Sequence, residues 1–199
     1  MTKWESPPRG RLKINVDGAF DLDKDMGGIG VVVRDADGRC IAALSKSVRH
    51  VHSVLSMEAE ACRAGLLLGF HQGWTNVDIE SDSATLIAAL RSEAADYSEV
   101  SRVLEDCKEY LSSFPSFSFR HIYREANSVA DRLAHFACSS SIDSIWLGES
   151  PAIIQDVLYE DSLSCNHVAR GSGYTPPPRL QNYSINIING TGRGAEPPS

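Results

Sequence analysis

The sequence predicts an α/β domain with a five-stranded mixed sheet flanked by helices, in the order βββαβααβα. Two kinds of segment predict it: early segments alternate apolar and polar residues, whereas later ones place apolar residues at helical spacing. The two kinds then alternate along the chain, which is typical of a sheet with helical connections. With 199 residues, 42% hydrophobic and 23% charged, the chain is long enough for one such domain and a tail.

Three segments near the start are predicted to be antiparallel strands, because apolar residues alternate with polar ones or form short β-branched runs. These segments are residues 12–17, 27–35 and 39–48. The sequence DADG at residues 35–38 is typical of a tight turn, so the second and third strands are expected to form a hairpin. Gly18 interrupts the first strand, where the backbone either turns or approaches another segment closely.

From residue 53 onward the hydrophobic period changes to that of a helix. The predicted helices are residues 53–72, 83–91, 98–114 and 127–138, and the predicted strands between them are residues 76–81 and 117–123. Ser98 is a suitable N-cap for the third helix, and Pro115 stops it. Since strands joined by a crossover helix run parallel, the sheet should be mixed.

The chain changes character after residue 140. We expect residues 1–140 to form the domain, residues 141–163 a short helical extension and residues 164–199 a disordered tail. The extension contains PAIIQDVLY, residues 151–159, which can form one short helix with proline in its first turn. The tail is rich in Ser, Gly, Asn and Pro and has no usable periodicity.

Composition excludes several classes of protein. No apolar run reaches 18 residues, so no membrane span is expected, and the N-terminus lacks the apolar segment of a secretory signal. The five cysteines form no CxxC pair and are interpreted as reduced, buried residues. We therefore expect a nuclear or cytoplasmic monomer. The net charge of −7 weakens the case for a nucleic-acid partner without excluding it, because acids that bind metal ions would be neutralised.

Four acids at the boundaries of predicted elements form the candidate site. Asp17 ends the first strand and Asp82 ends the fourth, and both share the parity of the polar positions in their strands. Glu58 lies in the first turn of the first long helix, and Asp131 lies one turn inside the last. Each alone has a structural explanation, as a turn residue, a cap or an acid favoured by the helix dipole. Because sites in open α/β sheets form beyond the carboxyl ends of strands, their convergence would favour a metal site.

These motifs, in this order, resemble type 1 ribonuclease H, and more closely the plant, reverse-transcriptase-like, retroelement-derived form of that domain. The matching segments include VDGA, MEAEA, ESDS and NSVAD; the resemblance covers residues 4–138, with a weaker match to residue 162. It implies a ribonuclease H-like fold and hydrolysis of the RNA strand of an RNA/DNA hybrid by two Mg²⁺ ions, with Mn²⁺ as an alternative. It assigns the metal-binding and catalytic roles to Asp17, Glu58, Asp82 and Asp131.

The resemblance also implies substrate contacts at Gly18, Arg124 and Asn127. Arg124 occupies the position at which related enzymes often carry a histidine. Arginine cannot act as a general base at neutral pH, but it can hold a phosphate. His121 lies in a strand-like segment and is interpreted as structural.

The motif MEAEA contains two glutamates, and both the family spacing and helix geometry select Glu58. At about 100° per residue, Glu58 shares a helix face with Cys62 and Gly65, which are small enough to pack closely against a sheet. Glu60 lies on another side of the helix, where Arg63 can pair with it. We therefore expect Glu58, and not Glu60, to join Asp17.

A second function is a retroelement-derived module that keeps the fold, binds nucleic acid or a protein partner and has weak or no cleavage activity. Four intact acids argue against it, since a binding module does not need them. The acidic segment SEAADY, residues 92–97, argues for it, because some relatives carry a basic substrate-gripping segment there. The spacing from Asn127 to Asp131 disfavours a processive nuclease of another branch of the superfamily.

Overall fold

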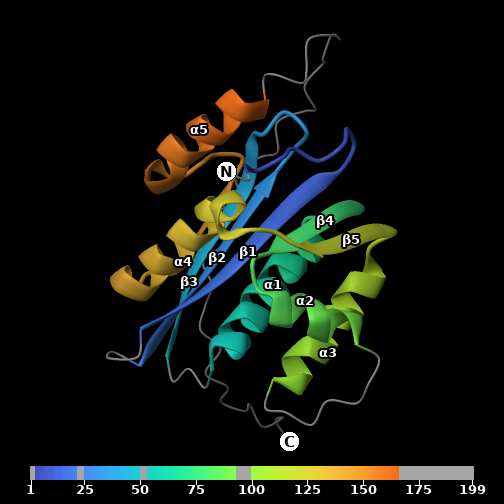
Figure 1. Ribbon diagram of the computed structural model, residues 1–199, viewed down its shortest axis with the longest axis vertical. Coiled ribbons are helices and arrows are strands. Elements are labelled where there is room, and N and C mark those ends of the chain that lie inside the picture. Colours follow the sequence, from blue (N-terminus) through green and yellow to red (C-terminus); the bar gives the residue numbers. More distant parts are fainter. Residues whose placement is uncertain (1–2, 22–24, 50–52, 93–99, 166–199) are drawn as a thin grey trace, which may run out of the picture.

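Figure 1 shows the computed structural model, in which helices lie on both faces of one twisted mixed sheet. The structure describes residues 3–21, 25–49, 53–92 and 100–165. The strands are β1 Leu12–Asp21, β2 Met26–Arg34, β3 Cys40–Arg49, β4 Asn76–Ser81, β5 Ser116–His121 and β6 Ser144–Leu147. The helices are α1 Val54–His71, α2 Ala84–Arg91, α3 Ser101–Ser113, α4 Ser128–Ser140 and α5 Gln155–Cys165, with 3₁₀ helices η1 Arg124–Ala126 and η2 Ala152–Ile154.

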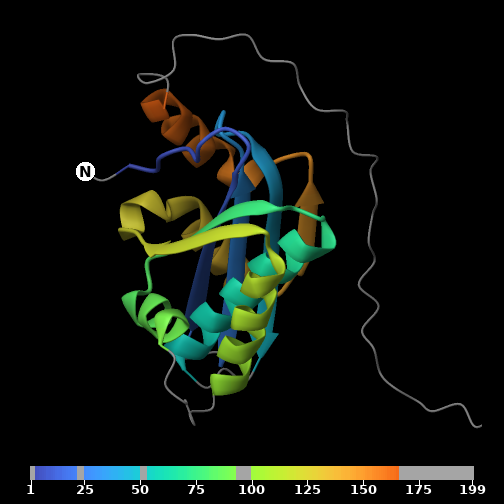
Figure 2. The same cartoon turned by 90° about the vertical axis from the view of Figure 1, so that its right-hand side faces the viewer.

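The predicted fold class is confirmed. β1 pairs antiparallel with β2 and parallel with β4, β2 pairs antiparallel with β3, and β4 pairs parallel with β5, so the sheet is mixed. The predicted number of strands is wrong, because the described sheet has six strands in the order β5-β4-β1-β2-β3-β6. Figure 2 shows the additional strand β6 (orange arrow) at the edge beside β3. Its four residues are too few to produce a recognisable alternation.

The first long helix begins where a serine pair caps it. Ser53 Oγ accepts from the Ser56 amide at 3.1 Å, and the Ser56 hydroxyl accepts from the Ser53 amide at 3.1 Å. This capping box satisfies two of the amides that a helix start leaves unpaired. The third helix begins at Ser101, and the predicted cap Ser98 lies outside the described residues. The predicted stop at Pro115 agrees with the end of α3 at Ser113.

Two apolar cores cover the two faces of the sheet. On one face, α1 and α2 pack against the strands and α3 packs against α1; this core includes Ile14, Val16, Val77, Ile79, Leu66 and Leu104. On the other face, α4 lies over β1, β2 and β3. The approach of α4 is close enough to require glycine beneath it, since a Cβ on Gly30 would lie 2.1 Å from the Ala130 carbonyl oxygen.

A buried polar network joins the N-terminal segment, the sheet and α5. Arg34 on β2 is 1% exposed, and its guanidinium lies 3.6 Å from the centroid of the Trp4 ring. Asn15 Oδ1 accepts from Trp4 Nε1 at 3.0 Å and from Arg34 Nη2 at 3.1 Å. The charge of Arg34 is balanced by Asp161 on α5, at 2.6 Å. α5 is therefore attached to the sheet through the Asp161 carboxylate, which balances the buried charge of Arg34.

Within the described ranges, no helix is both long and apolar enough to cross a bilayer. Among the cysteines that the structure describes, Cys62, Cys107 and Cys138 are buried and in no disulfide, as predicted, whereas Cys40, also in no disulfide, is partly exposed. Burial raises the pKa of the Cys40 thiol to about 11, so it stays protonated near neutral pH. These thiols contribute to packing.

The network predicts that α5 contributes to stability through Asp161. Asp161→Ala should lower the free energy of unfolding by about 3 kcal/mol, because it leaves the buried guanidinium of Arg34 without its counter-charge. Asp156→Ala on the same helix is the matched control, since Asp156 pairs with Arg132 at the surface, where an ion pair contributes little. Urea unfolding should give this control the wild-type midpoint. Equal midpoints for the two variants would contradict the role of Asp161.

Candidate metal centre

The structure brings three of the predicted site acids together at the start of α1, beside β1 and the end of β4. Asp17 comes from β1, Glu58 from α1, and Asp82 from the residue after β4. One carboxylate oxygen from each lies within 4.8 Å of the others. Asp17 and Glu58 are 6% and 7% exposed, so this cluster is largely shielded from water.

Gly18 brings the helix and the strand together at this point. The prediction that Asp17 ends its strand is wrong, because β1 continues to Asp21. A Cβ on Gly18 would lie 2.6 Å from the Met57 carbonyl carbon and 2.7 Å from the Glu58 nitrogen, so only glycine allows α1 to lie so close. The Gly18 amide also donates to the Glu58 carboxylate. Of the two explanations for this glycine, the close approach holds and the turn does not.

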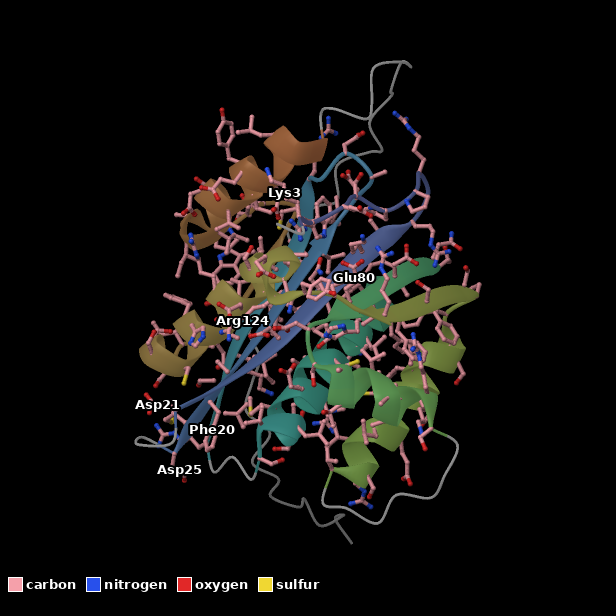
Figure 3. The ribbon with its side chains drawn as sticks, viewed as in Figure 1. Lys3, Phe20, Asp21, Asp25, Glu80 and Arg124 are labelled. Atoms are coloured by element: carbon pink, nitrogen blue, oxygen red, sulfur yellow. The ribbon has the colours of Figure 1, made fainter. Side chains whose placement is uncertain are left out.

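The fourth predicted acid, Asp131, lies beside the cluster and forms an ion pair with an arginine. Asp131 Oδ1 accepts from Arg124 Nη2 at 2.6 Å, and His135 Nε2 lies 3.6 Å from the same oxygen. Figure 3 labels Arg124, which lies near the middle of β1 in that view. Asp131 is close enough to contribute to the raised pKa of Asp17, although four other causes, burial first, contribute more. Its carboxylate therefore acts on the cluster electrostatically but is bound to arginine.

Asn127, just before α4, links the two ligand-bearing strands from inside the protein. It is fully buried, and its Nδ2 donates to the Val16 carbonyl at 3.0 Å and to Asp82 Oδ1 at 2.8 Å. These bonds fix the Asp82 carboxylate relative to the backbone next to Asp17. The sequence predicts Asn127 to be the first residue of the last helix, and the resemblance implies a substrate contact; its side chain makes no capping bond. A substrate contact for Asn127 stays a prediction.

The carboxylates strongly perturb one another. Burial, followed by the charges of Glu58 and Asp82, raises the pKa of Asp17 to about 9. Burial, followed by the charge of Asp82, raises the pKa of Glu58 to about 8, although hydrogen bonds from Gly18 and Ser81 oppose this. Glu58 Oε2 is buried and has no hydrogen-bond partner. Crowded, under-satisfied carboxylates must take up a proton or a cation, and oxygen donors suit a hard divalent cation such as Mg²⁺ or Mn²⁺.

The two glutamates of MEAEA have separate environments. Glu58 points into the cluster, whereas Glu60 binds Arg63 at 2.6 Å, and Arg63 also binds Asp106 on α3 at 2.9 Å. The predicted pairing of Glu60 with Arg63 is therefore confirmed. The sequence indicated that Glu58 lies in the first turn of α1, but the structure places it just beyond that turn. A stabilising helix-dipole interaction is consequently a poor explanation for Glu58.

Comparisons with known proteins agree with this geometry. A family described as reverse transcriptase-like matches residues 15–137, a range that includes all four acids. A putative ribonuclease H protein of Arabidopsis thaliana is 28% identical over 170 residues. That alignment covers 85% of this chain but 27% of the relative, so the chain spans about a quarter of the relative's length.

Solved structures share the fold. RNase H1 from the halophilic archaeon Halobacterium salinarum gives a TM-score of 0.61 at 23% identity, over 65% of this chain and 98% of that one. An N-terminal RNase H domain from Mycobacterium tuberculosis gives 0.60 at 22% identity, over 66% and 95%. LC11-RNase H1 in complex with an RNA/DNA hybrid gives 0.58 at 22% identity, over 65% and 98%. Nearly the whole of each neighbour therefore fits within part of this chain.

The raised pKa values predict that the metal-free cluster destabilises the protein as pH rises. An unfolded aspartate loses its proton near pH 4, whereas folded Asp17 keeps it up to about pH 9, so the folded state binds more protons across this interval. The contribution of Asp17 to stability is therefore most favourable at low pH and falls as pH rises toward 9. In EDTA, Asp17→Asn should be more stable than wild type by at least about 1 kcal/mol at pH 8 and by less at pH 5.

Urea unfolding at the two pH values measures this difference. Asp37→Asn, in the exposed turn after β2, is the control and should follow wild type at both. Adding Mg²⁺ at pH 8 should stabilise wild type more than Asp17→Asn, because a cation relieves the repulsion that the substitution has already removed. A pH-independent difference between wild type and Asp17→Asn would contradict the electrostatic origin.

Proposed function

The chain belongs to the reverse transcriptase-like, RNase H-like family, and we propose that it is a metal-dependent endonuclease that hydrolyses the RNA strand of RNA/DNA hybrids. The convergence of Asp17, Glu58 and Asp82 is the observation that carries the proposal. A buried, mutually repelling carboxylate cluster costs stability, so it has no structural purpose without a cation. The hybrid-bound LC11-RNase H1, a fold neighbour, supports this choice of substrate.

We propose two divalent ions, Mg²⁺ or alternatively Mn²⁺, held by Asp17, Glu58, Asp82 and Asp131. When bound, such ions would activate a water and stabilise the charge that develops on the phosphate and the leaving oxygen. The protein's part is to hold the carboxylates in place. The Gly18 amide and Ser81 donate to Glu58, and Asn127 holds one oxygen of Asp82. Asn127 thereby acts as a positioning residue.

Arg124 is the proposed phosphate contact. Its side chain is 70% exposed, and one of its nitrogens binds Asp131. Since a guanidinium carries five N–H donors, the others remain able to bond to a phosphate oxygen. Gly18, partly exposed beside Asp17, is the proposed backbone contact to the substrate.

One observation favours the alternative of a weakly active binding module. Two arginines, on β5 and on η1 after it, each form an ion pair with an acid: Arg120 binds Glu80 at 2.6 Å, and Arg124 binds Asp131 at 2.6 Å. Most of the acidic segment at residues 92–97 lies outside the described residues. Hybrid affinity from charge alone is therefore modest, and cleavage must be measured directly.

The three carboxylate variants test the activity. Asp17→Asn and Glu58→Gln should each lower Mg²⁺-dependent cleavage of a labelled RNA/DNA hybrid by at least about a hundredfold, since each removes a charged metal ligand. Glu60→Gln is the matched control on the same helix and should cleave like wild type. Circular dichroism should show that all three variants remain folded. Full cleavage activity in Asp17→Asn would contradict the proposed enzymatic function. Loss of cleavage in Glu60→Gln but not in Glu58→Gln would overturn the choice of Glu58 over Glu60.

The role of Arg124 predicts a change in salt dependence. Arg124→Ala should weaken hybrid binding and reduce the slope of log Kd against log salt by about one, as expected for the loss of one phosphate contact. Arg132→Ala, on the neighbouring helix and paired with Asp156, is the control and should keep the wild-type slope. Fluorescence anisotropy over a salt series measures both. An unchanged slope in Arg124→Ala would remove this residue from the binding site.

A further inference from the structure

A largely exposed aromatic side chain lies beside the segment that carries Arg124. Tyr123 is 63% exposed, and its ring meets that of His121 edge-on, with the centroids 6.2 Å apart. Its backbone is fixed, because the Tyr123 carbonyl accepts from the Ala126 amide at 2.9 Å at the start of η1. The ring is therefore presented to solvent from a rigid position.

Contacts on both sides connect this ring to the candidate ligands. His121 Nε2 lies 3.1 Å from the backbone oxygen of Asp82, and the Ile122 amide donates to the Ser81 carbonyl at 2.9 Å. On the other side of Tyr123, the adjacent residue Arg124 binds Asp131. The interpretation of His121 as structural is compatible with this contact, since the imidazole supports the tyrosine ring and reaches the backbone of a ligand residue.

We propose that Tyr123, supported by His121, is a stacking platform for a ribose of the nucleic-acid strand whose phosphate lies at the carboxylate cluster. This inference rests on the proposed function and specifies how the site holds its substrate. A nucleotide in a paired strand exposes its sugar and its anionic phosphate, and Tyr123 and Arg124 offer the complementary pair side by side. Packing of an aromatic ring on the sugar does not depend on the identity of the base, as a nuclease without sequence preference requires.

The charge of the protein gives this contact its importance. The chain carries a net charge of −7, and Arg120 and Arg124 are both paired with acids. Electrostatic attraction to a polyanion is therefore small, and part of the affinity must come from a contact that salt does not screen. Packing of the tyrosine ring on a ribose meets this requirement, because its strength depends on contact area and dispersion more than on net charge.

The same residue type elsewhere in the protein provides a control. Tyr159 on α5 is 65% exposed, which is almost the exposure of Tyr123. Its chain neighbours on α5 include Glu160 and Asp161, so the surroundings are acidic and unsuited to a polyanion. Removing the Tyr159 ring changes exposed aromatic area by a similar amount without touching the site.

The test measures binding and turnover in the full chain. Binding of a fluorescent RNA/DNA hybrid is followed by anisotropy in a Glu58→Gln background, so that the hybrid stays intact. In this background Tyr123→Ala should raise Kd at least about fivefold at every salt concentration, with the slope against salt unchanged. With the glutamate intact, Tyr123→Ala should raise KM and leave kcat within about twofold. Tyr123→Phe should restore most of the lost binding, and Tyr159→Ala should bind like its parent.

Three outcomes would overturn the inference. Equal Kd values for Tyr123→Ala and Tyr159→Ala would show that the ring does not touch the substrate. A loss in Tyr123→Phe as large as that in Tyr123→Ala would assign the contact to the hydroxyl and exclude stacking. If the wild-type chain neither binds nor cleaves the hybrid, the proposed function fails together with the inference, whereas the first two outcomes leave that function standing.

Discussion

The close approach of α1 to β1 at Gly18 is the constraint on which the rest of this structure depends. It places the Glu58 carboxylate beside Asp17, with Asp82 completing the group. At about 5 Å and an effective dielectric constant of about 20, each pair of charged carboxylates repels by about 3 kcal/mol. Burial first, and the charges of neighbouring carboxylates second, raise the pKa values of Asp17 and Glu58. A fold that holds this arrangement must oppose it elsewhere.

That opposition comes from packing on both faces of the sheet and from polar links between strands. Gly65 on α1 packs against Ile14 and Val16, which fixes the helix against β1 below the cluster. On the other face, Asn127 ties the start of α4 to β1 and to Asp82. Further along the strands, Glu80 accepts from Lys13, Asn15 and Arg120, so β1, β4 and β5 are held in register by one buried acid. The protein's own contacts therefore fix the spacing of β1 and β4.

Much of this arrangement follows from local patterns, and the remainder depends on contacts between distant segments. The alternation of residues 12–17 and the helical period after residue 53 identify the elements, and the face shared by Glu58, Cys62 and Gly65 distinguishes Glu58 from Glu60. A glycine at position 18 shows that something unusual happens, but not that a helix packs there instead of a turn. The buried pair Arg34–Asp161 is separated by 127 residues and leaves no periodic signal. Strand β6 is likewise too short to be recognised before its partner strand is known.

The pairing of Arg124 with Asp131 joins the proposed phosphate contact to one of the proposed metal ligands. Without a metal, the arginine and the aspartate satisfy each other at 2.6 Å, with the arginine side chain largely exposed. A pair so open to water contributes only about 0–1 kcal/mol, so breaking it costs little. On the proposed function, a cation and a phosphate that bind together would replace both members of this ion pair. Asp131 would contact the metal cation in place of Arg124, and Arg124 would contact the phosphate in place of Asp131. Binding of the cation alone would leave Arg124 without a counter-charge, and binding of the phosphate alone would leave Asp131 without one, beside Asp17 and Asp82. The geometry therefore favours binding of cation and substrate together over binding of either alone.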